Sequence, residues 1–208
     1  ATAVSIASIS VRELPGAHAA QTISARRPTS QTADGLHWLS FDGIDDLLLT
    51  PSVNLSATAR LNLFAGVRKV SDVARGGIVN QNADATRSFS LTAPRENGVP
   101  NFAASAGNTL IRHATVTSAA PVTAVLAATH DIGASAAQSL SVNGGAPAVV
   151  TGGTGAASTF QYGALGIGGF VTAERWFNGR LFGLIVRGAE TSAFASSNAT
   201  RFMAAKTG

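Results

Sequence analysis

Three acidic residues lie close together in the segment LHWLSFDGIDDLLLT: Asp42, Asp45 and Asp46. Carboxylate oxygens are the ligands that calcium prefers, which makes these side chains candidate metal ligands. The alternative is turn chemistry, in which Asp side chains accept hydrogen bonds from their own backbone. The dense D-x-D-x-D spacing of a calcium loop is missing, and this favours the turn.

A carbohydrate site combines an aromatic ring, on which a sugar ring stacks, with polar groups that bind hydroxyls. Trp176 has such neighbours, because Arg175 and Asn178 lie beside it in the polar segment AERWFNGR. Trp38 and Tyr162 are the other large amphipathic rings. These five residues are our candidate ligand contacts. The alternative places Trp38 in the core and Trp176 over an edge of the fold.

Residues for catalysis are harder to find. A glycosidase needs two carboxylates beside the scissile bond, commonly as E-x-D-x-E on one strand, and no Glu here has an acidic residue two positions later. There is no G-x-S-x-G nucleophile motif. The histidines share no metal-ligand spacing: His18, His37, His113 and His130. We therefore predict that the chain is not an enzyme.

Short alternating segments, separated by Gly, Pro and Asn-Gly turns, would position these side chains. They recur at intervals of about ten residues, which predicts an all-β fold: an antiparallel β-sandwich or jelly roll. Strands are expected at residues 59–70, 77–80, 88–92, 101–106, 109–116, 122–129, 139–142, 162–170 and 179–187.

Two turns and one helix complete this prediction. Asp42-Gly43 is expected to close an entry hairpin over residues 36–50, and Asn143-Gly144-Gly145 a second hairpin. Residues 191–206 show helical spacing, with Thr191 or Ser192 as the cap, which predicts one short C-terminal helix.

The chain divides into three parts by pattern. Residues 1–14 alternate as a single strand, which is assigned either to this domain or to a preceding one. In residues 15–34 the apolar residues recur with neither helical nor strand spacing, and the segment contains Pro28. This predicts an extended arm or linker. Residues 35–208 form the predicted sandwich.

Composition excludes several classes of protein. The chain has 208 residues and no cysteine, so it has room for a full core and contains neither disulfides nor thiolate sites. Its net charge is +4, but the basic residues are scattered rather than clustered, which argues against a nucleic-acid partner. No window approaches the roughly 18 apolar residues of a membrane span, which argues against membrane insertion.

The segments LHWLSFDGIDDLLL and FNGRLFGLIVRG, followed by a terminal helix, resemble a concanavalin A-like jelly roll of the laminin G (LamG) type. The combination of PGAHAAQ, ARRP, FDGIDD and the AAKTG ending is similar to domains at the C-terminal ends of bacteriophage tail, fibre or spike proteins. Some LamG-like relatives bind calcium, which is the only cofactor that the resemblance implies.

This resemblance implies a non-catalytic, lectin-like carbohydrate-binding domain for host attachment. It would lie on the surface of a virion or phage-like particle, outside cells, and would bind bacterial surface polysaccharide. Its other partners would be further virion subunits, including copies of itself. Two alternatives stay open: a structural virion module that binds no glycan, and, with less support, a polysaccharide-degrading enzyme.

Overall fold

The computed structural model describes residues 18–81, 87–107, 111–133, 137–152, 159–170, 173–188 and 191–208. The strand predicted at residues 1–14 lies outside these residues, as does most of the loop that follows Gly152. Within the described part, no helix has both the length and the apolar character needed to span a bilayer.

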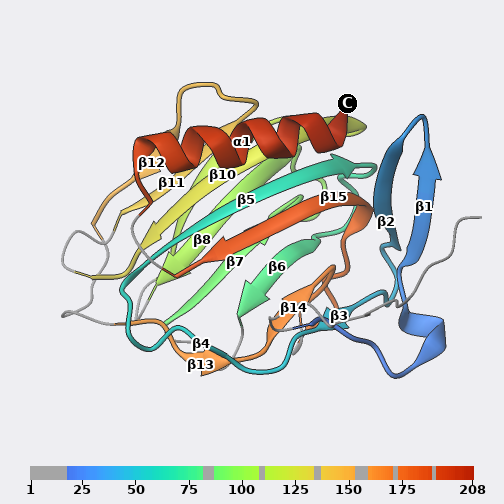
Figure 1. The fold of residues 1–208 in the computed structure, drawn as a ribbon, viewed down its shortest axis with the longest axis horizontal. Helices are drawn as coiled ribbons and strands as arrows, with labels where there is room; N and C mark the ends of the chain where they lie inside the picture. The colour runs from blue at the N-terminus through green and yellow to red at the C-terminus, as the bar shows by residue number, and fades with distance from the viewer. Residues whose placement is uncertain are drawn as a thin grey trace, which may run out of the picture.

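Two antiparallel sheets face each other across the core (Figure 1). The larger sheet has seven strands, in the order β1 (Thr29–Ala33), β2 (Leu36–Asp42), β15 (Asn178–Arg187), β5 (Arg60–Lys69), β10 (Val122–Asp131), β11 (Gln138–Val142) and β12 (Ala148–Val150). The smaller sheet has six strands, in the order β3 (Leu48–Leu49), β14 (Leu165–Ile167), β6 (Gly77–Gln81), β7 (Ser88–Thr92), β8 (Asn101–Gly107) and β9 (Arg112–Thr117). β4 (Val53–Asn54) and β13 (Tyr162–Gly163) form a separate pair. The predicted antiparallel sandwich is confirmed.

The hydrophobic core forms because alternate residues of each strand point between the sheets. On β5 these are Leu61, Leu63, Ala65 and Val67, all with no exposed surface. They belong to one cluster with buried residues of the smaller sheet, among them Phe89, Leu91 and Phe102. The central strands β5, β6 and β8 are buried on their opposite faces as well, so other parts of the chain cover the outside of both sheets.

Lys69, at the end of β5, is also completely buried between the sheets. Its Nζ lies 2.6 Å from Oδ1 of Asp72 and donates to the carbonyls of Asn101 at 3.2 Å and Ser118 at 2.6 Å. The amine also lies 4.7 Å from the centre of the Phe102 ring. Lys69 thus links the larger sheet to the start of β8 and to the segment after β9.

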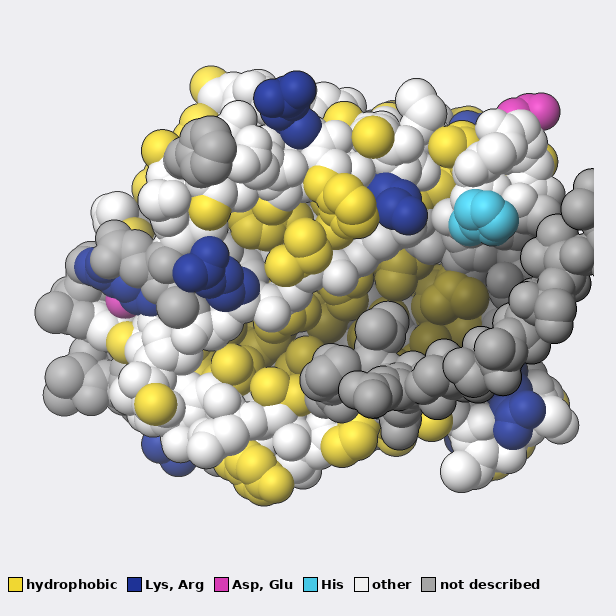
Figure 2. Space-filling view, viewed as in Figure 1, with side chains coloured by type: hydrophobic (Ala, Val, Ile, Leu, Met, Phe, Trp, Pro, Cys, Tyr) yellow, Lys and Arg dark blue, Asp and Glu magenta, His cyan; other side chains and the backbone are white. Residues whose placement is uncertain are grey.

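The C-terminal helix is confirmed as α1 (Ala193–Thr207). Ser192 caps it, since its side chain accepts a hydrogen bond from the backbone N–H of Ala195. Figure 1 shows α1 lying across the outer face of the larger sheet, where Met203 packs against Phe64 and Val125. In the same view, Figure 2 shows hydrophobic side chains gathered in a hollow below the helix.

The predicted entry hairpin is wrong. β2 pairs with β1 through a turn at Asp34-Gly35, whose φ angles are 52° and 75°, whereas β3 belongs to the other sheet. Asp42-Gly43 therefore begins a corner between the sheets. Both sites carry the same Asp-Gly signal, and only the partner strand distinguishes a hairpin from a corner. The second predicted hairpin is confirmed, since β11 pairs with β12.

The predicted arm over residues 15–34 differs from the structure in its described part. Ala20 forms a bridge with Leu49, and a short 3-10 helix, η1 (Ser24–Arg26), precedes β1. All five side chains of β1 are exposed, so the strand shows no apolar alternation in the sequence. Its backbone pairing with β2 holds it at the sheet edge.

Two glycines with positive φ provide a matched test of this architecture. At Gly35 a Cβ would meet nothing within 4 Å, whereas at Gly168 it would lie 1.9 Å from the ring of Phe41. We expect Gly35→Ala to lower the free energy of unfolding by about 1 kcal/mol, the cost of the backbone conformation alone. Gly168→Ala should cost at least about 3 kcal/mol, because the core must also shift. Urea unfolding measures both values, and equal losses would contradict the predicted contact with Phe41.

Candidate functional site

A row of polar side chains crosses the outer face of the smaller sheet. Asn80 of β6 pairs with Ser90 of β7, Ser90 with Ser105 of β8, and Ser105 with His113 of β9. Residues opposite each other in antiparallel strands point to the same side, so the four side chains form one line. They form the floor of a cavity of about 280 Å³.

The rim of this cavity carries two arginines and an aromatic ring. Phe170 follows β14, and the guanidinium carbons of Arg75 and Arg175 each lie 5.3 Å from the centre of its ring. The exposed Ile111 lines the rim as well. The cavity therefore combines an apolar surface, two cationic groups and a polar floor.

The two arginines raise the electrostatic potential of the rim. Burial, followed by the repulsion of Arg175 and Arg95, lowers the pKa of Arg75 from its ordinary value, and Glu96 partly offsets this. Glu96 itself pairs with Arg95. Within the described residues, neither Arg75 nor Arg175 forms an ion pair.

His113 is neutral in this environment. Burial and the nearby arginines, Arg95 foremost, lower its pKa to about 4. Its Nδ1 lies 2.8 Å from Oγ of Ser105, which fixes the ring on the floor of the cavity. At neutral pH it therefore serves as a hydrogen-bonding group rather than as a charge.

Two polar atoms at the cavity lack a hydrogen-bond partner among the described residues: Nε of Arg75 and Oδ1 of Asn80. Asn80 is 1% exposed, and its Nδ2 donates to the carbonyls of Gly166 and Gly169 on the segment that leads to Phe170. A buried polar atom without a partner costs free energy, which a ligand can recover. The cavity thus offers an acceptor and a donor to a polar ligand.

The five predicted ligand contacts lie in different places, and they remain predictions. Arg175 lines the cavity. The ring of Trp176 packs against Gly169, and Asn178 pairs with Asp42 at the sheet corner. Tyr162 is 63% exposed on the separate strand pair. Trp38 stacks under Arg180 on the outer face of the larger sheet, with the guanidinium carbon 4.6 Å from the ring centre.

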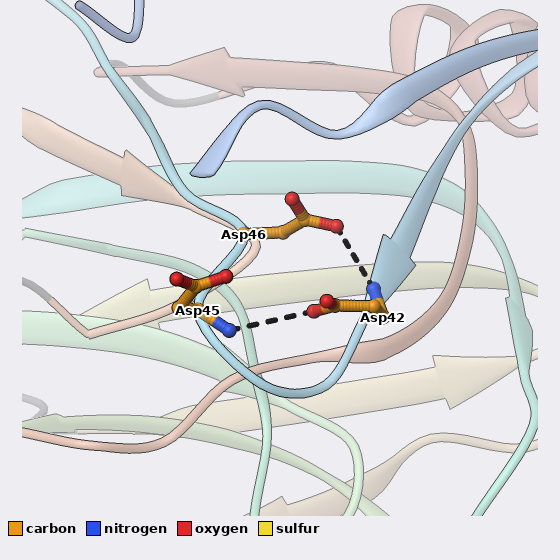
Figure 3. Close-up of side chains that lie close together, drawn as sticks. All are labelled: Asp42, Asp45 and Asp46. Atoms are coloured by element: carbon orange, nitrogen blue, oxygen red, sulfur yellow. Dashed lines mark hydrogen bonds between the residues drawn. The ribbon is translucent and has the colours of Figure 1, made fainter. Parts of the chain in front are cut away.

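The three predicted metal ligands do converge, with carboxylate oxygens all within 4.8 Å of one another (Figure 3). Oδ1 of Asp42 accepts from the N–H groups of Ile44 and Asp45, and Oδ2 of Asp46 accepts from the N–H of Asp42. Asp45 lies 3.7 Å from Nε of Arg26. Each carboxylate therefore already has a hydrogen-bond or ion-pair partner within the protein. This favours a structural role in the turn over a cation site.

The cavity was not predicted from the sequence. Of the residues that line it, only Arg175 was a predicted ligand contact. Its floor residues come from four strands, and each one alone is an ordinary polar residue in an alternating segment. Only the register of the strands places them in line. The one available signal was the presence of Asn and Ser inside otherwise apolar strands, such as GIVNQ and SFSLT.

Comparison with known structures adds the fold family. The mouse laminin alpha1 chain, domains LG4-5, matches with a TM-score of 0.57 and 13% identity, covering 84% of this chain and 50% of that chain. This chain thus spans about half the length of the laminin fragment. The fold is a concanavalin A-like jelly roll.

Two further structures share this jelly roll. The Limulus polyphemus SAP-like pentraxin matches with a TM-score of 0.55 and 10% identity over 86% of this chain and 82% of that one. The Ruminococcus gnavus IT-sialidase CBM40, bound to alpha2,3 sialyllactose, matches with a TM-score of 0.51 and 12% identity over 75% of this chain and 98% of that one. No family model and no curated protein sequence matches the chain.

The acidic corner leads to a prediction for Asp46. Burial, together with Asp42 and Asp45, raises the pKa of Asp46, so the folded state loses stability as the pH rises through that pKa. We expect Asp46→Asn, which keeps an acceptor for the N–H of Asp42, to leave the free energy of unfolding at pH 7 unchanged or to raise it by up to about 1 kcal/mol.

Thermal unfolding with calcium and with a chelator tests the alternative. For the parent and for Asp46→Asn alike, we expect calcium to leave the Tm unchanged, and Asp34→Asn, at an exposed turn outside the cluster, is the control. A calcium-dependent rise of Tm in the parent that Asp46→Asn removes would establish a cation site and overturn the turn interpretation.

A second prediction concerns His130, which is fully buried with its Nδ1 2.8 Å from Oε1 of Gln138. Burial lowers its pKa to about 4 from an ordinary value of 6.5. The unfolded chain therefore binds more protons between these two values, and stability falls as the pH is lowered through that window, by up to roughly 3 kcal/mol.

Chemical unfolding at several pH values measures this effect. We expect His130→Gln to flatten the pH dependence of the free energy of unfolding between pH 6.5 and about 4, whatever its effect on stability at neutral pH. His37→Gln, at an exposed position, is the matched control. An unchanged slope in His130→Gln would contradict the prediction.

Proposed function

We propose that this chain is a non-catalytic carbohydrate-binding domain whose ligand occupies the cavity on the smaller sheet. The observation that carries the proposal is the polar row of Asn80, Ser90, Ser105 and His113, which lines one cavity. Such a row offers hydrogen bonds to the hydroxyls of a sugar, and the exposed Ile111 offers an apolar surface to its C–H groups.

The comparisons support this proposal at the level of the fold. The R. gnavus CBM40 binds sialyllactose on the same jelly roll. A fold does not fix a function, so the argument depends on the cavity itself.

The cavity also supports the absence of catalysis. Hydrolysis of a glycosidic bond requires two carboxylates beside it. None of the described residues that line the cavity is Asp or Glu. The groups present bind and orient a sugar but supply neither the acid nor the nucleophile.

The setting that we propose is the surface of a bacteriophage or phage-like particle, where the domain, on a fibre or spike, binds bacterial surface polysaccharide. Its support is the resemblance of PGAHAAQ, ARRP, FDGIDD and AAKTG to domains at the ends of such proteins. Weak single sites would suffice there, because display in several copies raises the effective concentration.

An array of bacterial capsular polysaccharides, probed with a multivalent form of the full chain, tests the proposal. We expect binding to at least one polysaccharide and a loss of roughly tenfold or more in affinity for His113→Ala. Tyr162→Ala tests the alternative site at the exposed ring on β13. His37→Ala, at an exposed position outside the cavity, is the matched control and should bind as the parent does.

Each other outcome is informative. If Tyr162→Ala loses binding and His113→Ala does not, the ligand binds at Tyr162 on β13 and not in the cavity. Binding to no polysaccharide would favour the structural virion module. Release of reducing ends from capsule by the parent chain would revive the enzyme alternative. Circular dichroism confirms that the variants are folded.

A further inference from the structure

We propose that the saccharide bound in this cavity is acidic, with its anionic substituent lying between Arg75 and Arg175. This inference rests on the proposed function and names the chemical class of the ligand. The guanidinium groups approach one aromatic ring, that of Phe170, at equal distances of 5.3 Å from its centre. The two guanidinium groups repel each other, and an anion bound beside both of them offsets this repulsion.

The hydrogen bonds that these arginines lack support the same conclusion. Nε of Arg75 is buried and has no partner among the described residues. No described carboxylate pairs with either guanidinium. Guanidinium groups bind carboxylate, sulfate or phosphate through parallel hydrogen bonds, and these are among the strongest polar contacts in proteins.

The loop geometry holds both arginines at the rim. The N–H of Arg75 donates to Oδ1 of Asn97 at 2.8 Å, and the carbonyl of Arg175 accepts from the N–H of Gly77 at 3.1 Å. The first bond attaches the Arg75 segment to the loop between β7 and β8, and the second attaches the Arg175 segment to the start of β6. A ligand meets a preformed site, because the backbone of each arginine is already fixed.

The floor of the cavity carries no charged side chain, so we expect only one part of the ligand to be charged. Asn80, Ser90, Ser105 and the neutral His113 offer hydrogen bonds without charge. The cavity thus has a cationic rim and a neutral polar floor. This division fits a sugar ring that carries one anionic group beside several hydroxyls, as in a uronic or sialic acid or a sulfated sugar.

The test compares polysaccharides that differ only in charge. Immobilised polysialate, hyaluronan, polygalacturonate, dextran sulfate, neutral dextran and mannan are probed with the full chain, together with the capsular polysaccharide that binds best on the array. Each carboxylated polymer is also presented after chemical reduction of its carboxyl groups. We expect an acidic polymer to bind best and its reduced form to bind roughly tenfold to a hundredfold more weakly.

Variants locate the charge effect. Arg75→Gln and Arg175→Gln should each weaken binding of the acidic polymer by roughly tenfold or more and should remove most of its salt dependence. Arg180→Gln is the matched control, because it removes the same charge from the opposite sheet, where Arg180 stacks on Trp38. Arg175→Lys keeps the positive charge but lacks the planar guanidinium group. We expect its loss of affinity to lie between those of the parent and of Arg175→Gln.

The outcomes separate this inference from the proposed function. If a neutral or carboxyl-reduced polymer binds as tightly as the acidic one and His113→Ala still abolishes binding, the carbohydrate site stands and the acidic ligand is wrong. An equal loss in Arg180→Gln would also overturn the inference, since the effect would then be nonspecific. If dextran sulfate alone binds through Arg75 and Arg175, the anionic group is a sulfate. If no polysaccharide binds, both proposals fall.

Discussion

The buried amine of Lys69 is the contact on which the arrangement of the two sheets depends. A charge without water is costly unless its partners are in place, and here they come from β8 of the smaller sheet, from the segment after β9 and from the loop after β5. Asp72 completes the link, since its Oδ2 accepts from the N–H of Ala120 and its carbonyl from the N–H of Gly98. The loop that is fixed in this way continues directly to Arg75. The position of the cationic rim therefore follows from an interaction inside the sandwich.

The cavity shows how an antiparallel sheet builds a site from distant parts of the sequence. Asn80 and His113 are separated by two strands and by more than thirty residues, yet the register places them in one row. On the other sheet, α1 covers much of the outer face and Arg180 stacks on Trp38, and a shorter polar row of Asn62, Thr129 and Ser139 crosses β5, β10 and β11. The row on the smaller sheet differs in that two arginines, Arg75 and Arg175, line the same cavity.

Much of the fold could be predicted from the sequence, because alternation and turn residues are local signals. β5, β10 and α1 appear close to their expected positions for this reason. The entry hairpin failed since Asp34-Gly35 and Asp42-Gly43 carry the same local signal, and the choice between them depends on which strand pairs with β2. The cavity could not be predicted for a related reason. A row across four strands exists only once their register is known, and no single segment contains it.

The side chain of Asn80 has a consequence for how the site responds to a ligand. One amide supports the rim through Nδ2, which donates to the carbonyls of Gly166 and Gly169, and presents Oδ1 at the floor. Hydrogen bonds that share an amide polarise one another, so a hydroxyl that donates to Oδ1 strengthens the bonds made by Nδ2. In the proposed complex, a hydroxyl on the floor therefore strengthens the hydrogen bonds that hold the segment carrying Phe170. One planar amide thus belongs both to the proposed binding floor and to the support of the rim.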